Sequence, residues 1–136
     1  MMLHDETIRG APLDWLDRAR GHLALAKQTK PEAAFWEDLC FHAQQAAEIA
    51  IKAVYQHNDL VYHYTHDIHD LVNGLGESGI PITPVVSEAA VLTRYASQTR
   101  YPGAFERVTR MEYQEALRLA ESVVAWAEEH MGVGRD

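Results

Sequence analysis

One amphipathic pattern, over residues 33–57, limits the possible folds of this chain more than any other feature. Apolar side chains recur there at three- and four-residue steps, which places them on one face of an α-helix. They are Leu39, Ala43, Ala46, Ala50, Ala53 and Val54. Most are alanines, and such small side chains allow a neighbouring helix to approach closely. The pattern therefore predicts a long helix with another helix packed tightly against it.

Two further helices are expected on either side of this long helix. The first begins near Pro12, which suits the first turn of a helix, and is ended by residues 29–31. A short helix is capped by Thr65 or His63 and is ended by the glycines at positions 74 and 76. These breaks predict short connections rather than separate domains.

The last third of the chain predicts two more helices. One starts near Pro84 and ends around residues 97–99, because Tyr101 precedes a proline and is biased toward extended backbone. The final helix opens with a capping box over residues 109–112, and it is ended by Gly132 and Gly134.

No segment alternates in the manner of a β-strand, so the predicted fold class is all-α. The expected architecture is an antiparallel up-and-down bundle of four longer helices plus one short helix. Its length of 136 residues is enough for one domain with a hydrophobic core. We expect a single domain over residues 1–136, with its core at about residues 12–131.

The charge balance excludes one broad class of function. Twelve Lys and Arg face 20 Asp and Glu, giving a net charge of −8, and no basic run is present. Proteins that coat DNA or RNA rely on basic surface, so broad nucleic-acid binding is not expected. The lone Cys40 suits a reducing compartment, and no apolar run is long enough to span a bilayer. These features predict a cytoplasmic location and no membrane partner.

A repeated Arg-Tyr pair is the strongest candidate for a binding site. Arg94-Tyr95 and Arg100-Tyr101 precede a break at Pro102-Gly103. Arginine matches phosphate or carboxylate with a planar fork of donors, and tyrosine rings stack on bases or guanidinium groups. Because the break frees Arg100 from the helical direction, the two arginines are predicted to converge on one anion. Arg and Tyr also anchor protein–protein contacts, so an interface remains the alternative.

A polar stripe on the long helix is the second candidate. Gln44, Glu48 and Lys52 lie four residues apart, with Glu48 and Lys52 in the favourable order for an ion pair. The two interpretations of this stripe are a functional surface and an ordinary solvent-exposed face.

The histidines and the cysteine do not predict a metal site or a nucleophile. His63, His66 and His69 spread too far around a helix axis for one undistorted metal site. Cys40 and His42 lie on different helix faces, so Cys40 is predicted to be a small buried residue. We expect no metal and no cofactor.

Three segments in this order resemble the HEPN domain family, from about Leu13 to Met131. They are Phe41-His-Ala-Gln-Gln-Ala-Ala-Glu48-Ile-Ala-Ile-Lys52-Ala, His66-Asp-Ile-His-Asp-Leu71 and Arg94-Tyr-Ala-Ser-Gln-Thr-Arg-Tyr-Pro-Gly103. The resemblance implies a two-fold dimer that binds a nucleotide and is commonly encoded beside a minimal nucleotidyltransferase, in toxin–antitoxin-type pairs. It implies a groove between the Gln44–Glu48–Lys52 stripe and the Arg94–Arg100 segment. Tyr101, from the second Arg-Tyr pair, is included in the predicted binding site.

The chain departs from the HEPN ribonucleases at one point. Those enzymes place a catalytic histidine four to six residues after an arginine, and neither Arg94 nor Arg100 is followed by one. We therefore expect a non-catalytic module that binds a nucleotide or a nucleotidyltransferase. The alternatives are a ribonuclease toxin that uses Arg94 and Arg100 with a distant histidine, such as His42 or His66, and a purely structural dimer.

Overall fold

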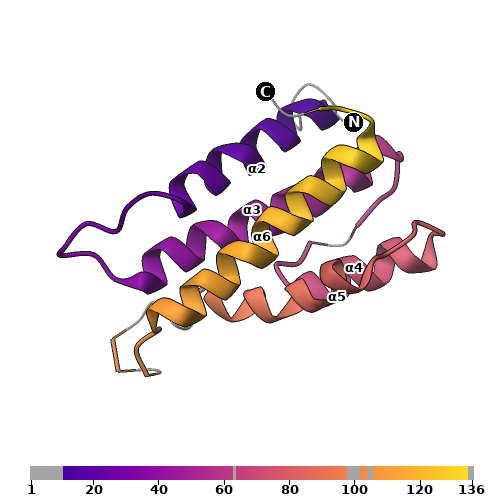
Figure 1. The fold of residues 1–136 in the computed structure, drawn as a ribbon. Coiled ribbons are helices and arrows are strands. Elements are labelled where there is room, and N and C mark those ends of the chain that lie inside the picture. The colour runs from indigo at the N-terminus through magenta and orange to yellow at the C-terminus, as the bar shows by residue number, and fades with distance from the viewer. Residues whose placement is uncertain (1–10, 63, 98–101, 104–105, 135–136) are drawn as a thin grey trace.

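The computed structural model describes residues 11–62, 64–97, 102–103 and 106–134 (Figure 1). Within these ranges every regular element is helical, which confirms the all-α prediction. The elements are α2 (Pro12–Ala26), α3 (Trp36–His57), α4 (Ile68–Glu77), α5 (Pro84–Glu88), the 3₁₀-helix η1 (Ala89–Tyr95) and α6 (Arg110–Met131).

The three longest helices form the body of the bundle, and α3 also contacts α4 and η1. At one end Trp36 of α3 stacks on Tyr113 of α6, with ring centroids 4.9 Å apart. At the other end His57 meets His130 at 5.7 Å, so α3 and α6 run in the same direction. The Tyr113 hydroxyl donates to the carbonyl of Ala26, at the last turn of α2, over 2.7 Å. Helix α2 therefore runs antiparallel to both.

The alanine face of α3 is fully buried, as its pattern predicts. Ala43, Ala46, Ala50 and Ala53 expose none of their surface, and Cys40 is buried one turn before them. Small side chains keep the backbones of packed helices close, so α2 and α6 can both lie against α3. Figure 1 shows these three helices side by side along most of their length.

Four predicted boundaries of α2, α3 and α4 are wrong. Helix α2 ends at Ala26, before the predicted break, and α3 begins only at Trp36. Helix α4 is capped by neither Thr65 nor His63, the latter lying outside the described residues. Instead the Asp67 carboxylate accepts a hydrogen bond from the His69 backbone N–H at 2.9 Å. The glycines at 74 and 76 lie inside α4, where tertiary packing outweighs their low helix propensity.

The segment after Pro84 also differs from its prediction. It forms only five residues of α-helix and then tightens into η1, which ends at Tyr95 rather than around residues 97–99. Burial of Leu92 and Tyr95, which are 0% and 4% exposed, draws this segment onto the bundle.

The predicted ends of α6 are confirmed. The Thr109 hydroxyl accepts from the Glu112 backbone N–H at 3.1 Å, and the Glu112 carboxylate accepts from the Thr109 N–H at 2.8 Å. Gly132 ends the helix in the left-handed conformation, with φ of 73°, which glycine adopts without strain.

The loop between α3 and α4 turns back along α3 instead of leaving the bundle. Leu60 donates its backbone N–H to the carbonyl of Tyr55 at 2.9 Å, and the Tyr62 ring lies edge-on to Tyr55. By residue 66 the loop has returned to the level of Glu48, eighteen positions earlier. This return brings two distant parts of the sequence together at the candidate site.

Candidate functional site

The polar stripe of α3 is buried rather than exposed. Gln44, Glu48 and Lys52 retain 0%, 3% and 6% of their exposed surface. The returning loop covers them: the Lys52 ammonium lies 5.2 Å from the centroid of the Tyr62 ring, and His66 reaches Glu48. The interpretation as an ordinary solvated face is therefore wrong.

Glu48 is the centre of this buried network. Its Oε1 accepts from Gln44 Nε2 at 2.6 Å, and its Oε2 accepts from Lys52 Nζ at 2.8 Å. Burial raises the pKa of a carboxyl, but hydrogen bonds from Lys52, His66 and Gln44 outweigh that effect and hold the pKa of Glu48 below its usual value. Glu48 is therefore a charged acceptor. The other amide atom of Gln44, Oε1, is buried without a hydrogen-bond partner among the described residues.

His66 connects the buried network to the surface. Its Nδ1 lies 2.9 Å from Glu48 Oε2, while its side chain is 56% exposed. A carboxylate only accepts hydrogen bonds, so in the neutral imidazole the proton sits on Nδ1 and the outer Nε2 is an acceptor. The hydroxyl of Tyr64, an 85% exposed residue, lies 3.3 Å from that Nε2. Glu48 thus orients the ring and sets which nitrogen faces outward.

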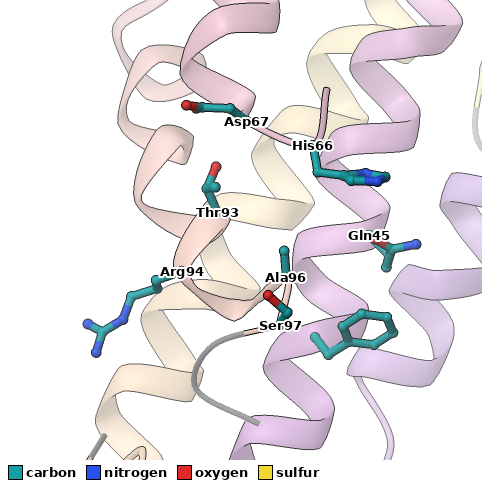
Figure 2. Close-up of a pocket in the computed structure, with 8 residues that line it drawn as sticks. Gln45, His66, Asp67, Thr93, Arg94, Ala96 and Ser97 are labelled. Carbon is teal, nitrogen blue, oxygen red and sulfur yellow. The ribbon is translucent and has the colours of Figure 1, made fainter. Parts of the chain in front are cut away.

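Beside His66 a pocket of about 690 Å³ opens between α3, the returning loop and η1 (Figure 2). Its lining combines a cation, an imidazole, an aromatic ring and small polar groups: Phe41, Gln45, His66, Asp67, Thr93, Arg94, Ala96 and Ser97. Thr93 ties the two sides together, because its hydroxyl accepts the Ile68 backbone N–H at 3.0 Å. Such a concave site, mixing apolar and polar groups, is typical of small-ligand binding.

Arg94 lies on the η1 side of this pocket. In Figure 2 its guanidinium points away from His66, and its central carbon lies 5.4 Å from the centroid of the Tyr95 ring. The two groups therefore border one pocket from different sides without meeting. Arg100 and Tyr101 lie outside the described residues, so their predicted convergence with Arg94 stays a prediction.

The sequence identified some of these residues and missed others. Gln44, Glu48 and Lys52 lie behind His66 and do not line the pocket, whereas the neighbouring Gln45 does. Phe41 and Gln45 share a helix face four residues apart, and that spacing was the available signal for them.

The structure bears on two roles considered above for the histidines, a distant catalytic group and a metal site. His42 does not line the pocket: its Nδ1 lies 3.1 Å from His22 Nδ1, at the contact between α3 and α2. His63 lies outside the described residues. Within them, no group of three or more possible metal ligands occurs. Of His42 and His66, the two histidines distant in sequence from Arg94, only His66 lines the pocket.

The His22–His42 pair predicts a loss of stability in acid. Burial lowers the pKa of His22 below its ordinary 6.5, and the neighbouring His42 and Arg18 lower it further. The two imidazole rings are in contact, so protonating both would place like charges side by side. Below pH 6.5 the unfolded chain therefore binds more protons than the folded one, and the free energy of unfolding falls as pH falls. Urea unfolding at several pH values between 5 and 8 measures this slope.

A His22→Gln variant should show a shallower slope, while His69→Gln, which changes an exposed ring, should keep the parent's slope. Burial also lowers the pKa of His130, so part of the slope remains in both variants. Equal slopes for His22→Gln and the parent would contradict the assignment.

None of the helices in the described residues is long and apolar enough to cross a membrane. No curated protein sequence matches the chain. The chain is similar to two proteins of known crystal structure. TT1696 from Thermus thermophilus is 37% identical, with a TM-score of 0.75, over 87% of this chain and 96% of that one. ST0689, described as an archaeal HEPN homologue, is 22% identical, with a TM-score of 0.72, over 90% of this chain and 98% of that one.

The similarity to ST0689 supports the fold, and the similarity to TT1696 extends to the sequence. The family model of the HEPN domain matches residues 13–130, which is nearly the whole chain. With the helical bundle described above, this match assigns the family: the chain belongs to the HEPN domain family.

Proposed function

We propose that this protein is a homodimeric nucleotide-binding module of the HEPN family. It belongs to the non-nuclease branch that pairs with minimal nucleotidyltransferases, and it acts in the cytoplasm as one half of a toxin–antitoxin-type pair. The observation that carries the proposal is that His66, held by a buried carboxylate, and Arg94 border one pocket of nucleotide size.

The chemistry of the pocket favours a nucleotide over a purely apolar ligand. Its volume of about 690 Å³ falls within the range of about 300–1,000 Å³ that is usual for small-ligand sites. Arg94 supplies a planar donor set for phosphate, and His66 offers an acceptor nitrogen to a hydroxyl or amino group. Phe41 adds an aromatic surface for a base. In this arrangement the ligand spans the pocket from Arg94 to His66, so the two side chains need not converge.

The three buried residues of α3 take an indirect part in this proposal. Gln44 and Lys52 hold Glu48 charged, and Glu48 holds the His66 ring in its outward orientation. Arg100 and Tyr101, six positions after Arg94 and Tyr95, are proposed to add a further phosphate contact.

Exposed apolar side chains support binding of a second copy or a partner protein. Val61, Tyr64, Val91 and Met111 are all more than half exposed in the described part of the chain. Isolated exposed apolar residues are common, but Val61 and Tyr64 stand within one short loop.

Calorimetric titration with AMP, ATP and UMP tests nucleotide binding. We expect Arg94→Lys to weaken binding about tenfold or more, because it loses the planar fork of charge-assisted hydrogen bonds, which contribute about 1.5–3 kcal/mol each. His66→Gln should weaken binding about fivefold, because a hydrogen bond between neutral groups contributes about 0.5–1.5 kcal/mol. Arg118→Lys, which changes an exposed arginine on α6, should bind like the parent. Light scattering on the same samples should give about twice the chain mass of 15.4 kDa. Parental affinity in both pocket variants would refute the site.

A ribonuclease is the second candidate, and the Glu48–His66 pair favours it. A carboxylate that fixes an imidazole, with the second nitrogen open to a pocket, is an arrangement suited to general acid–base catalysis. There His66 Nε2 would accept the proton of a ribose 2′-hydroxyl, a role that no histidine near Arg94 in the sequence can fill.

Incubation of the protein with mixed RNA separates the two candidates. We expect no cleavage above background from the parent, because the Arg94 guanidinium does not face His66. The matched variants are His66→Gln in the pocket and His42→Gln outside it. Robust cleavage that His66→Gln abolishes and His42→Gln preserves would replace the binding module with the ribonuclease.

A further inference from the structure

A second, smaller pocket lies where the returning loop leaves α3. It has a volume of about 210 Å³ between the loop, the end of α3 and α4. Its lining combines aromatic rings with acidic groups: Tyr55, Val61, Tyr62, Asp70, Leu71, Gly74, Glu77 and Ser78. It shares no lining residue with the larger pocket, so its role is independent of the proposed function.

The charge of this pocket is entirely negative. Asp70 and Glu77 stand seven residues apart on α4, which is close to two full turns, so they share one helix face. No Lys, Arg or His lines the pocket. Among the ion pairs of the described residues none involves Glu77, and the contact of Asp70 is a long one, 3.9 Å to His69 Nδ1. The two carboxylates are thus able to accept an incoming cation.

A hydrogen bond and a ring contact position the aromatic wall of the pocket. The Tyr55 hydroxyl donates to the carbonyl of Leu71 at 2.6 Å, and the Tyr62 ring meets Tyr55 edge-on, with centroids 5.2 Å apart. Gly74 leaves room for this packing, because a Cβ atom there would collide with the Tyr55 hydroxyl. Burial and the Glu77 carboxylate raise the pKa of Tyr55, which agrees with a negative potential in the pocket.

Two features indicate which cation fits. The volume of about 210 Å³ is below the usual range of about 300–1,000 Å³ for small-molecule sites, so the pocket suits the end of one side chain. The rim carries Val61, which is 94% exposed and offers an apolar contact to a neighbouring residue of a protein. Lys52 already occupies a face of the Tyr62 ring, so the carboxylates rather than that ring must recognise the cation.

We propose that this pocket binds an arginine side chain of a protein partner. The guanidinium lies between the Asp70 and Glu77 carboxylates, with its methylene stem along the Tyr55 wall and an adjacent apolar residue on Val61. Arginine suits the site because its planar fork can serve two carboxylates at once. The net charge of −8 attracts a basic partner at long range.

Titration with a tetrapeptide tests this proposal. The probe is acetyl-Gly-Arg-Leu-Gly-amide, and its matched control carries citrulline, the neutral isostere of arginine. We expect chemical-shift changes at Gly74, Tyr55 and Glu77, and affinity about fivefold lower for the citrulline peptide. Glu77→Gln should weaken the arginine peptide, while Glu88→Gln, which changes an exposed carboxylate on α5, should not. Salt at about 0.5 M should weaken binding further.

Three results would overturn the proposal. Equal chemical-shift changes with the arginine and citrulline peptides would show that the pocket does not recognise the positive charge of arginine. Free agmatine, a small guanidinium compound, binding as tightly as the peptide would indicate a small-molecule site instead of a protein contact. A change of oligomeric state in Glu77→Gln, seen by light scattering, would make a second copy of this chain the occupant.

Discussion

Replacement of Lys52 by Met is expected to lower the free energy of unfolding by about 3 kcal/mol. Lys52 and Glu48 form an ion pair at 2.8 Å with only 8% and 4% of their side chains exposed. Removing one member of a buried pair typically costs about 3–5 kcal/mol, because the other charge is left buried without compensation. The lower end applies here, since Glu48 keeps its contacts with Gln44 and His66. Urea unfolding at fixed protein concentration measures the difference.

Two matched variants test whether the loss of stability arises from leaving a buried charge unpaired or simply from removing a lysine charge. Lys27→Met removes an exposed lysine that lies 3.4 Å from Glu121, and it should change stability by no more than about 0.5 kcal/mol. The double variant Glu48→Gln/Lys52→Met should regain part of the loss, because neither charge remains. The difference in the free energy of unfolding between the parent and Lys52→Met should also narrow as pH falls through 4.5. The pKa of Glu48 in the folded parent lies below that ordinary value, so the unfolded parent binds more protons there and the parent loses stability. An equal effect for Lys27→Met and Lys52→Met would contradict the buried network.

Leu92→Ala is expected to cost about 2–5 kcal/mol, the usual range for truncating a buried leucine. Leu92 is fully buried and belongs to η1, whose 3₁₀ hydrogen bonds have poorer geometry than those of an α-helix. Packing therefore holds this segment, and with it Thr93 and Arg94, against the bundle. We expect lower thermal stability together with weaker nucleotide binding, although Leu92 does not line the pocket.

The neighbouring Val91→Ala provides the control for this experiment. Val91 is 58% exposed on the same 3₁₀ segment, so its truncation should leave both stability and binding nearly unchanged. A loss of stability in Leu92→Ala without any change in binding would show that η1 does not position the pocket.

The helical content could be predicted from the sequence because it depends on local information. The alanine face of α3 follows from side-chain spacing, and the start and end of α6 follow from Thr109, Glu112 and Gly132, whose effects act within one turn. The all-α class and the family resemblance needed no knowledge of which helices touch. The boundaries of α4 and the tightening of η1 were missed, because packing against distant residues outweighed local preference there.

The candidate site depended on long-range contacts that no local pattern contains. The spacing of Gln44, Glu48 and Lys52 showed a polar stripe, but the same spacing fits an exposed face and a buried network equally well. The returning loop decides between them, because it covers the stripe and places His66 within 2.9 Å of Glu48. Hydrogen bonding to the buried carboxylate then orients the imidazole toward a pocket whose opposite side, η1, lies about thirty residues further along the chain. Helix formation is governed by neighbours in sequence, whereas burial, charge pairing and pocket shape are governed by neighbours in space.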